Sequence, residues 1–152
     1  MSKAINPTEI ERCCPYSFSM TDDRKVQVST AASAALAIRS HLRSSRHPNA
    51  FREVIQLLND LDGVTLEHAQ QMVAEPPVLV DERYDALLAG AVEWKLNQLN
   101  LPIPTWVQES KPLASPWWVY DPLTGDGSVE EETPKELRRR RVFVEERDLI
   151  SV

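Results

Sequence analysis

The sequence predicts a mainly α-helical protein: a small helical bundle of about four helices, with a Pro/Trp-rich wrapping segment and a short C-terminal helix. Apolar residues recur at helical spacing between residues 28 and 100, and residues suited to helix N-caps precede each stretch. Prolines recur between residues 101 and 132 and exclude both a long helix and a central strand there. A chain of 152 residues with 42% hydrophobic content is large enough for one domain with a core.

The chain divides into three expected parts. Residues 1–25 lack hydrophobic periodicity and are expected to be a poorly ordered leader. Residues 26–101 form the helical domain, and residues 102–152 form a Pro/Trp-rich and Arg-rich C-terminal segment packed on it. The leader contains Cys13 and Cys14 side by side. Without further cysteines or a nearby histidine, these two thiols do not make a zinc site.

The first two expected helices have recognisable ends. Ser29 and Thr30 are good N-caps for a helix that runs to about Ser44. A second helix covers about residues 48–62, and Gly63 follows it at a position suited to a left-handed C′ residue. Its apolar stripe consists of Phe51, Val54, Ile55, Leu58 and Leu61.

Two further helices complete the helical domain. Thr65 caps a short helix that ends before Pro76 and Pro77. Asp81 caps a long helix to about Asn100, and its many apolar residues predict a broad buried face.

The C-terminal segment combines aromatic, proline and arginine residues. Its tryptophans are interleaved with prolines, so we expect the indoles to be buried as anchors over the helices. Residues Thr133–Glu136 read as a capping box with proline at N1, and the short helix that they start runs into the arginine run, Arg138–Arg141. Residues 142–144 are expected to form a brief extended segment.

The net charge of −6 is unevenly distributed. Residues 53–132 hold three Lys/Arg against fifteen Asp/Glu, a net charge of −12, whereas residues 1–52 carry +4 and residues 133–152 carry +2. A stretch this acidic is repelled by a phosphate backbone and attracted to a basic surface. The middle of the chain is therefore not expected to read nucleic acid.

No catalytic, metal or cofactor site is expected. His41, His47 and His68 lack ligand-spaced partners, and there is no G-x-S-x-G motif. With four glycines in the whole chain, neither a phosphate-binding loop nor a Rossmann turn is available. Asp81 and Asp85 have the spacing typical of a solvated helix start, where negative charge suits the helix dipole.

The sequence contains no apolar signal segment and no apolar run long enough to span a bilayer. We therefore expect a cytoplasmic protein that does not bind membranes.

Two features of the C-terminal segment are candidates for partner binding. Four arginines exceed what the end of a short helix needs, so the run is expected either to bind a phosphate, a carboxylate or an acidic partner, or to pair with Glu130–Glu132. Because neighbouring residues seldom both become buried, one indole of Trp117 and Trp118 is a candidate hot spot. The candidate partner-binding residues are Arg138, Arg139, Arg140, Arg141, Trp117 and Trp118.

A third candidate is the basic cluster, Arg39, Arg43 and Arg46, which has no intervening acidic residue. A helix pair across a tight turn is also found in helix-turn-helix units, so the basic cluster is the candidate DNA contact. The alternative is that it pairs with the acidic segment of the same molecule or of a second subunit, which would make a homodimer.

The C-terminal half resembles a known family. Pro104–Val107, Leu113–Trp118 and Thr133–Val144, together with the long helix from Asp81, resemble an uncharacterised C-terminal domain of actinobacterial proteins. Members often follow a helix-turn-helix regulator domain and are frequently encoded beside nucleotidyltransferase-like toxins, which implies an antitoxin role. No separate helix-turn-helix domain precedes the match in this sequence, so DNA-binding regulation does not carry over. The resemblance also supplies no catalytic residue.

These observations favour a non-catalytic protein-binding module, most concretely an antitoxin-like antagonist of a basic nucleotide- or RNA-handling partner such as a toxin. The alternative is a DNA-binding transcriptional regulator that uses the basic cluster. A small enzyme on a helical scaffold is the third hypothesis, and it requires a deep pocket with clustered carboxylates or a histidine.

Overall fold

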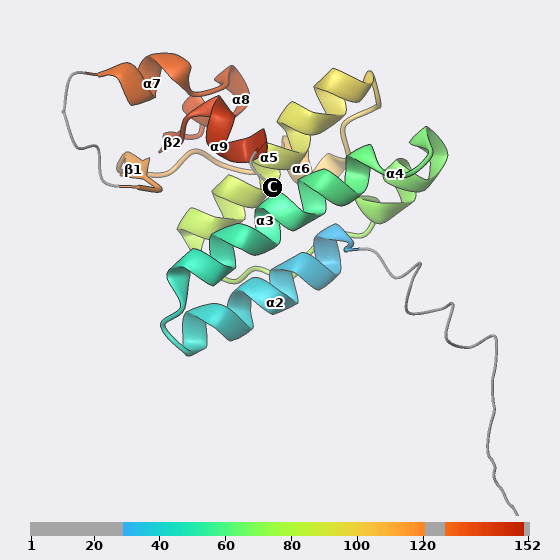
Figure 1. Ribbon diagram of the computed structural model, residues 1–152, viewed down its shortest axis with the longest axis horizontal. Coiled ribbons are helices and arrows are strands. Elements are labelled where there is room, and N and C mark those ends of the chain that lie inside the picture. Colours follow the sequence, from blue (N-terminus) through green and yellow to red (C-terminus); the bar gives the residue numbers. More distant parts are fainter. Residues whose placement is uncertain (1–28, 121–126, 151–152) are drawn as a thin grey trace, which may run out of the picture.

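The computed structural model describes residues 29–120 and 127–150, and the fold is mainly α-helical, as predicted. Helix α2 (Ala31–Arg43) and helix α3 (His47–Asp62) are antiparallel and lie side by side, joined by a turn over residues 44–46 (Figure 1). The predicted leader, residues 1–25, lies outside the described residues.

The predicted N-caps of the helical domain are confirmed. Thr30 Oγ1 accepts a hydrogen bond from Ser33 N at 3.0 Å, and Ser33 Oγ accepts one from Thr30 N, so a complete capping box starts α2. The hydroxyl of Thr65 likewise caps α4 (Leu66–Met72), and it accepts a hydrogen bond from His68 N at 3.1 Å.

Helix α5 (Glu82–Leu99) is the central element of the fold. Asp81 caps its start, and Asn100 ends it in the left-handed conformation with a φ of 59°. Every residue from 86 to 96 is buried, because α5 contacts α2 and α3 on one side and the C-terminal segment on another. A helix buried on nearly all sides explains why its sequence is apolar around most of its circumference.

The C-terminal segment forms short elements that pack against this bundle. Helix α6 (Thr105–Gln108) and helix α8 (Lys135–Arg138) both contact α5, and helix α9 (Glu146–Ile150) contacts α3. Strand β1 (Trp117–Trp118) pairs in parallel with strand β2 (Val142–Phe143), which confirms the predicted extended segment. Figure 1 shows these elements on the side of α5 away from α2.

One further helix, α7 (Ser128–Glu132), lies beside β1 at one end of the molecule (Figure 1). Together with α6 it confirms that the Pro/Trp-rich segment holds only short elements among its described residues.

The prediction for Gly63 is wrong. Its φ is −92°, so the residue is not left-handed, and its N–H donates to Asp60 O at 3.1 Å. The last turn of α3 therefore tightens through a bond to the third residue before, which satisfies a terminal carbonyl without a left-handed residue.

The predicted capping box at residues 133–136 is also wrong. The N-cap of α8 is Pro134, and the Thr133 side chain does not cap the helix. Instead, the Thr133 hydroxyl donates to Val129 O at 2.6 Å and accepts a hydrogen bond from Val144 N at 3.1 Å. The side chain of Glu136 accepts a hydrogen bond from Asn97 at 2.7 Å. Thr133 and Glu136 are buried, and buried polar groups need hydrogen-bond partners. Their side chains therefore bond to other elements and do not cap α8.

A close approach between α5 and α8 depends on Gly90. A Cβ placed on Gly90 would lie 2.5 Å from Leu137 Cδ2 and 3.4 Å from Glu136 O. Leu137 is fully buried, so the side chain has little room to move.

None of the helices among the described residues is both long and apolar enough to cross a lipid bilayer.

Candidate functional site

The arginine run is largely occupied within the chain. Arg140 is only 4% exposed, and its Nη1 donates to Glu93 Oε1 and to Glu136 O, both at 2.7 Å. Its Nη2 donates to Val107 O at 2.9 Å, and its Nε donates to Ser110 Oγ at 3.3 Å. This arrangement corrects the expectation that Arg140 binds a partner, because a buried guanidinium with all these acceptors cannot reach one.

The other three arginines of the run are more exposed. Arg139 pairs with Glu93 and keeps 57% of its side chain exposed. Arg138 donates to Thr133 O at 3.1 Å, and Arg141 donates to a carbonyl of the chain before β1 at 2.9 Å. Arg141 also has a φ of 64°, which turns the chain from α8 into β2. The exposed parts of these three side chains remain candidates for partner binding.

Glu93, not the predicted Glu130–Glu132, is the acidic partner of the arginine run among the described residues. Burial raises the pKa of Glu93, but hydrogen bonds and charges from Arg139 and Arg140 outweigh burial and hold the pKa below its ordinary value. The run therefore fixes the C-terminal segment onto α5.

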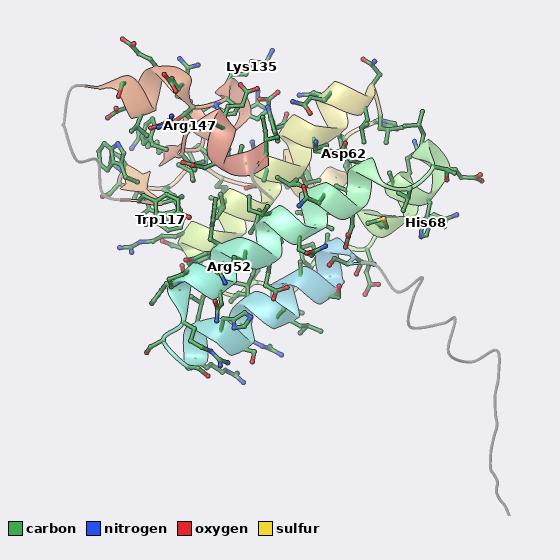
Figure 2. The ribbon with its side chains drawn as sticks, in the orientation of Figure 1. Arg52, Asp62, His68, Trp117, Lys135 and Arg147 are labelled. Atoms are coloured by element: carbon green, nitrogen blue, oxygen red, sulfur yellow. The ribbon has the colours of Figure 1, made fainter. Side chains whose placement is uncertain are left out.

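The two adjacent tryptophans are half-buried. The Trp117 ring meets the Tyr84 ring edge to face with centroids 5.1 Å apart, and Trp118 stacks on Phe143 at 5.4 Å. Trp118 Nε1 also donates to Glu130 Oε2 at 3.0 Å. Both indoles thus hold the short sheet in place, and Figure 2 shows Trp117 at β1. A hot-spot role for their exposed edges stays a prediction.

The basic cluster lies at the turn between α2 and α3. Arg43 and Arg46 are exposed and Arg39 is half-buried, and within residues 29–120 and 127–150 none of the three forms an ion pair. The helices lie side by side, unlike the crossed helices of a helix-turn-helix unit. The cluster could contact phosphates, but of the two helices that follow it, α3 carries a single arginine, Arg52, and α4 carries none.

Most of the carboxylates that the structure describes in the acidic middle segment pair with no Lys or Arg, although Glu53 Oε2 lies 3.1 Å from His41 Nε2. Over the described parts of residues 53–132, only Asp62 and Glu93 pair with a Lys or Arg, Asp62 at 2.8 Å from Lys95 Nζ. Asp62 lies at the C-terminal end of α3 (Figure 2). Six exposed glutamates of this segment have neither a side-chain hydrogen-bond partner nor an ion-pair partner within the described chain: Glu67, Glu75, Glu82, Glu109, Glu131 and Glu132.

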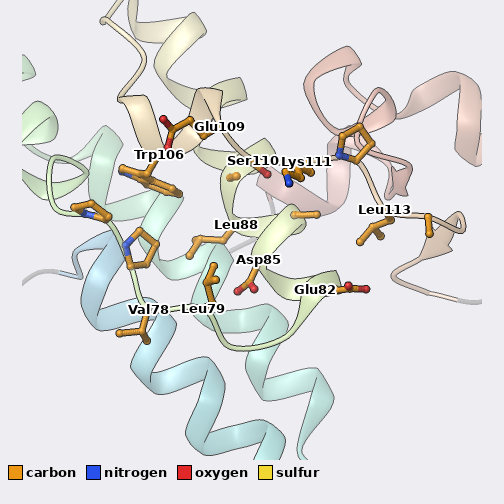
Figure 3. Close-up of a pocket in the computed structure, with 16 residues that line it drawn as sticks. Val78, Leu79, Glu82, Asp85, Leu88, Trp106, Glu109, Ser110, Lys111 and Leu113 are labelled. Carbon is orange, nitrogen blue, oxygen red and sulfur yellow. The ribbon is translucent and has the colours of Figure 1, made fainter.

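Two of these free glutamates line a groove of about 660 Å³. We name it the acidic groove, and its walls are Pro76–Leu79, the first half of α5 and residues 106–114. Figure 3 shows Val78 and Leu79 on one side of the groove, with Trp106 and Glu109 on the other. The lining carries the carboxylates of Glu82, Asp85 and Glu109 and one amine, Lys111.

The floor of the acidic groove is apolar. It includes Ala86, Leu88 and Ala89 of α5 and the buried Leu113, which α5 and the chain after α6 hold in place. Trp106 is fixed at the edge because its Nε1 donates to Val73 O at 2.8 Å. A concave apolar surface with several convergent polar groups is the usual form of a binding site.

The spacing of Asp81 and Asp85 predicts that both lie on a solvated face, but Asp85 does not. It is half-buried, and its Oδ1 accepts a hydrogen bond from Val80 N at 3.0 Å. Burial raises the pKa of Asp85 above its ordinary value, the charges of Asp81 and Glu82 raise it further, and hydrogen bonds from backbone N–H groups oppose the rise. The groove therefore holds a carboxylate in a position where a cation would stabilise it.

No cluster of three or more metal-ligating side chains occurs among the residues that the structure describes. His68 is exposed on α4 (Figure 2) and does not line the acidic groove. The groove thus pairs an apolar floor with negative charge, which suits recognition of an apolar and cationic ligand.

The groove was not predicted from the sequence. Val78 and Leu79 fit no helical stripe, and they stand between a Pro-Pro pair and a helix cap. Apolar residues that belong to no predicted core face, as Val78 and Leu79 do, are the sequence signal that could have indicated the groove.

Comparisons of the chain with protein-family models, with curated proteins and with solved structures found no match. The resemblance to antitoxin-like actinobacterial domains therefore stays a prediction.

Proposed function

We propose that the protein is a non-catalytic protein-binding module that recognises a basic surface of a partner protein. The observation that carries the proposal is the set of carboxylates around an apolar groove that have no basic partner among the described residues. Free carboxylates beside apolar surface give fast, salt-sensitive association with a basic partner, and burial of the apolar surface adds affinity.

The resemblance of the C-terminal half to antitoxin-like domains makes the proposal more specific. We infer an antagonist that covers the basic, nucleotide- or RNA-handling surface of a toxin in the cytoplasm. An acidic antagonist competes directly with the phosphate groups of such a partner's substrate, because both bind the same positive field.

The proposal is tested by purifying the tagged full-length chain from the cells that encode it, at low salt. We expect one stoichiometric basic protein to co-purify and to dissociate as salt is raised to roughly 1 M, where charges are screened beyond about 3 Å. Recovery of the chain alone, or with an acidic partner that salt does not release, contradicts the proposal.

A second candidate function is DNA binding through the basic cluster. It is favoured by the absence of ion pairs at Arg39, Arg43 and Arg46 within the described structure. Binding through phosphates alone is steeply salt-dependent and insensitive to sequence. A gel shift with genomic fragments at low salt, lost on Arg43→Glu, supports this function, and no shift at low salt removes it.

A further inference from the structure

The chain between α4 and α5 exposes apolar side chains at the rim of the acidic groove. Leu79 is 86% exposed and Val78 is 46% exposed, and both line the acidic groove, whose floor is apolar. Leu66 on α4 is also exposed, at 53%, but it does not line the groove. Apolar side chains that gather at a groove are typical of a surface that a partner covers.

The main chain of this rim is also open. The N–H and C=O groups of Val78 and Leu79 have no hydrogen-bond partner among residues 29–120 and 127–150. The next N–H along the chain, that of Val80, donates to Asp85 and fixes the rim to α5. Residues 78 and 79 belong to no sheet, but an extended peptide recognised through its main chain hydrogen-bonds to unpaired backbone groups of this kind beside side-chain pockets.

The charges of the groove select the side chains of such a peptide. The carboxylates of Glu82 and Glu109 are free, and they lie at different edges of the apolar floor (Figure 3). Asp85 is a third carboxylate in the lining, and Lys111 is the single amine there. Successive side chains of an extended peptide point to opposite faces. In a peptide that alternates basic and apolar residues, the apolar side chains therefore face the floor, and the cations point away from it toward the exposed carboxylates at its edges.

We propose that the acidic groove binds an extended segment of the partner protein that alternates Lys or Arg with apolar residues and pairs its main chain with Val78 and Leu79. This inference rests on the proposed function and names the part of the partner that the groove takes. A helical segment is disfavoured because its main chain is internally paired and leaves the open rim without hydrogen bonds.

The test is selection of displayed random nonapeptides on the immobilised full-length chain. We expect enrichment of peptides with Lys or Arg between apolar residues, and fluorescence anisotropy of the best synthetic peptide gives its affinity. N-methylation of alternate amides, which removes donors without changing charge, should weaken binding about tenfold or more. Equal affinity of the methylated peptide, or enrichment of acidic peptides, overturns the inference.

Matched variants locate the site. Leu79→Ser and Glu82→Lys should each weaken the selected peptide about tenfold, whereas Leu66→Ser and Glu67→Lys, which make the same changes at exposed positions outside the groove, should change it less than about twofold. If Glu82→Lys and Glu67→Lys weaken binding equally, the acidic surface attracts cations without the groove. In that case the inference fails and the proposed function stands.

The other occupant of such a surface is a second copy of the chain. Sedimentation of the wild-type protein and of Leu79→Ser distinguishes this case. A wild-type dimer that becomes monomeric in the variant overturns the inference, and a monomer in both supports it.

Discussion

Arg140 Nη1 lies 2.7 Å from Glu93 Oε1 inside the protein, and the two residues are 47 positions apart in the sequence. The same guanidinium also donates to carbonyls of α6 and α8, so one side chain joins α5 to two elements of the C-terminal segment. This segment forms one wall of the acidic groove through residues 106–114. The ion pair thus fixes the segment that forms this wall, and neither Arg140 nor Glu93 lines the groove.

Loss of the Arg140 charge should strongly destabilise the fold. Arg140→Met leaves the buried carboxylate of Glu93 with less compensation and removes the donor to Glu136 O, Val107 O and Ser110 Oγ, so we expect urea denaturation to show a loss of about 3–5 kcal/mol. Arg147, whose side chain is 79% exposed, provides the control, and Arg147→Met should change stability by about 0.5 kcal/mol or less. Equal unfolding midpoints for the two variants would show that the pair is not structural.

Acid should weaken the same contact. The pKa of Glu93 in the folded protein is below its ordinary value of 4.5, so its contribution is fully present above pH 4.5 and is lost as the pH falls through the folded pKa. The stability difference between wild type and Glu93→Gln should therefore be constant near neutral pH and shrink below pH 4.5. Chemical denaturation across this range measures it, and a difference that grows on acidification contradicts the assignment.

Gly90 should not tolerate a methyl group. Alanine ordinarily stabilises a helix interior by about 1 kcal/mol relative to glycine, but here the added Cβ meets Leu137, and overpacking costs about 1–3 kcal/mol. We expect Gly90→Ala to be destabilising by about 1 kcal/mol in urea titrations. Gly63 is the matched control: its φ is negative and nothing lies closer than 3.8 Å, so Gly63→Ala should be neutral or stabilising. The reverse order of the two variants would refute the close approach of α5 and α8.

Asp85 should lower the stability of the fold and strengthen binding of the partner. Because its pKa is raised in the folded protein, the charged form opposes folding at neutral pH, and this effect disappears as the pH falls through the folded pKa toward 3.8. Asp85→Asn keeps an oxygen acceptor for Val80 N and should therefore be more stable than wild type at pH 7. The same variant should bind the basic partner more weakly, as expected for a functional carboxylate. Thermal denaturation and a binding titration on one preparation test both effects, and an unchanged affinity removes Asp85 from the binding groups.

The helical domain followed from the sequence because its signals are local. Caps such as Thr30, Thr65 and Asp81 act within one turn, and apolar periodicity identifies the buried face of each helix. The prediction of a left-handed Gly63 was wrong because residue preference does not determine which of several available terminal hydrogen bonds a helix end forms. The predicted capping box at Thr133 was wrong because the Thr133 hydroxyl bonds to Val129 and Val144, and a local sequence pattern does not predict partners outside the helix.

The candidate site was harder to predict for the same reason. Arg140 and Arg139 are neighbours in the arginine run and both pair with Glu93, yet Arg140 is buried and Arg139 is exposed. They differ because Arg140 alone also donates to acceptors on α6 and α8. The acidic charge of the middle segment was visible, but the groove that collects part of it is formed by three segments that meet only in the fold. Local sequence patterns do not encode long-range proximity of this kind, and the only local signal of the groove is the pair of apolar residues, Val78 and Leu79, that belong to no helical stripe.

Free carboxylates at the groove are proposed to bind a basic partner. Isothermal titration of the co-purified partner tests this proposal most directly, with wild type, the Glu82→Gln/Glu109→Gln variant and a Glu67→Gln/Glu132→Gln control in which two exposed carboxylates outside the groove are neutralised. We expect the groove variant to lose about tenfold or more in affinity and most of its salt dependence, while the control stays within about threefold of wild type. Wild-type affinity in the groove variant would contradict the account.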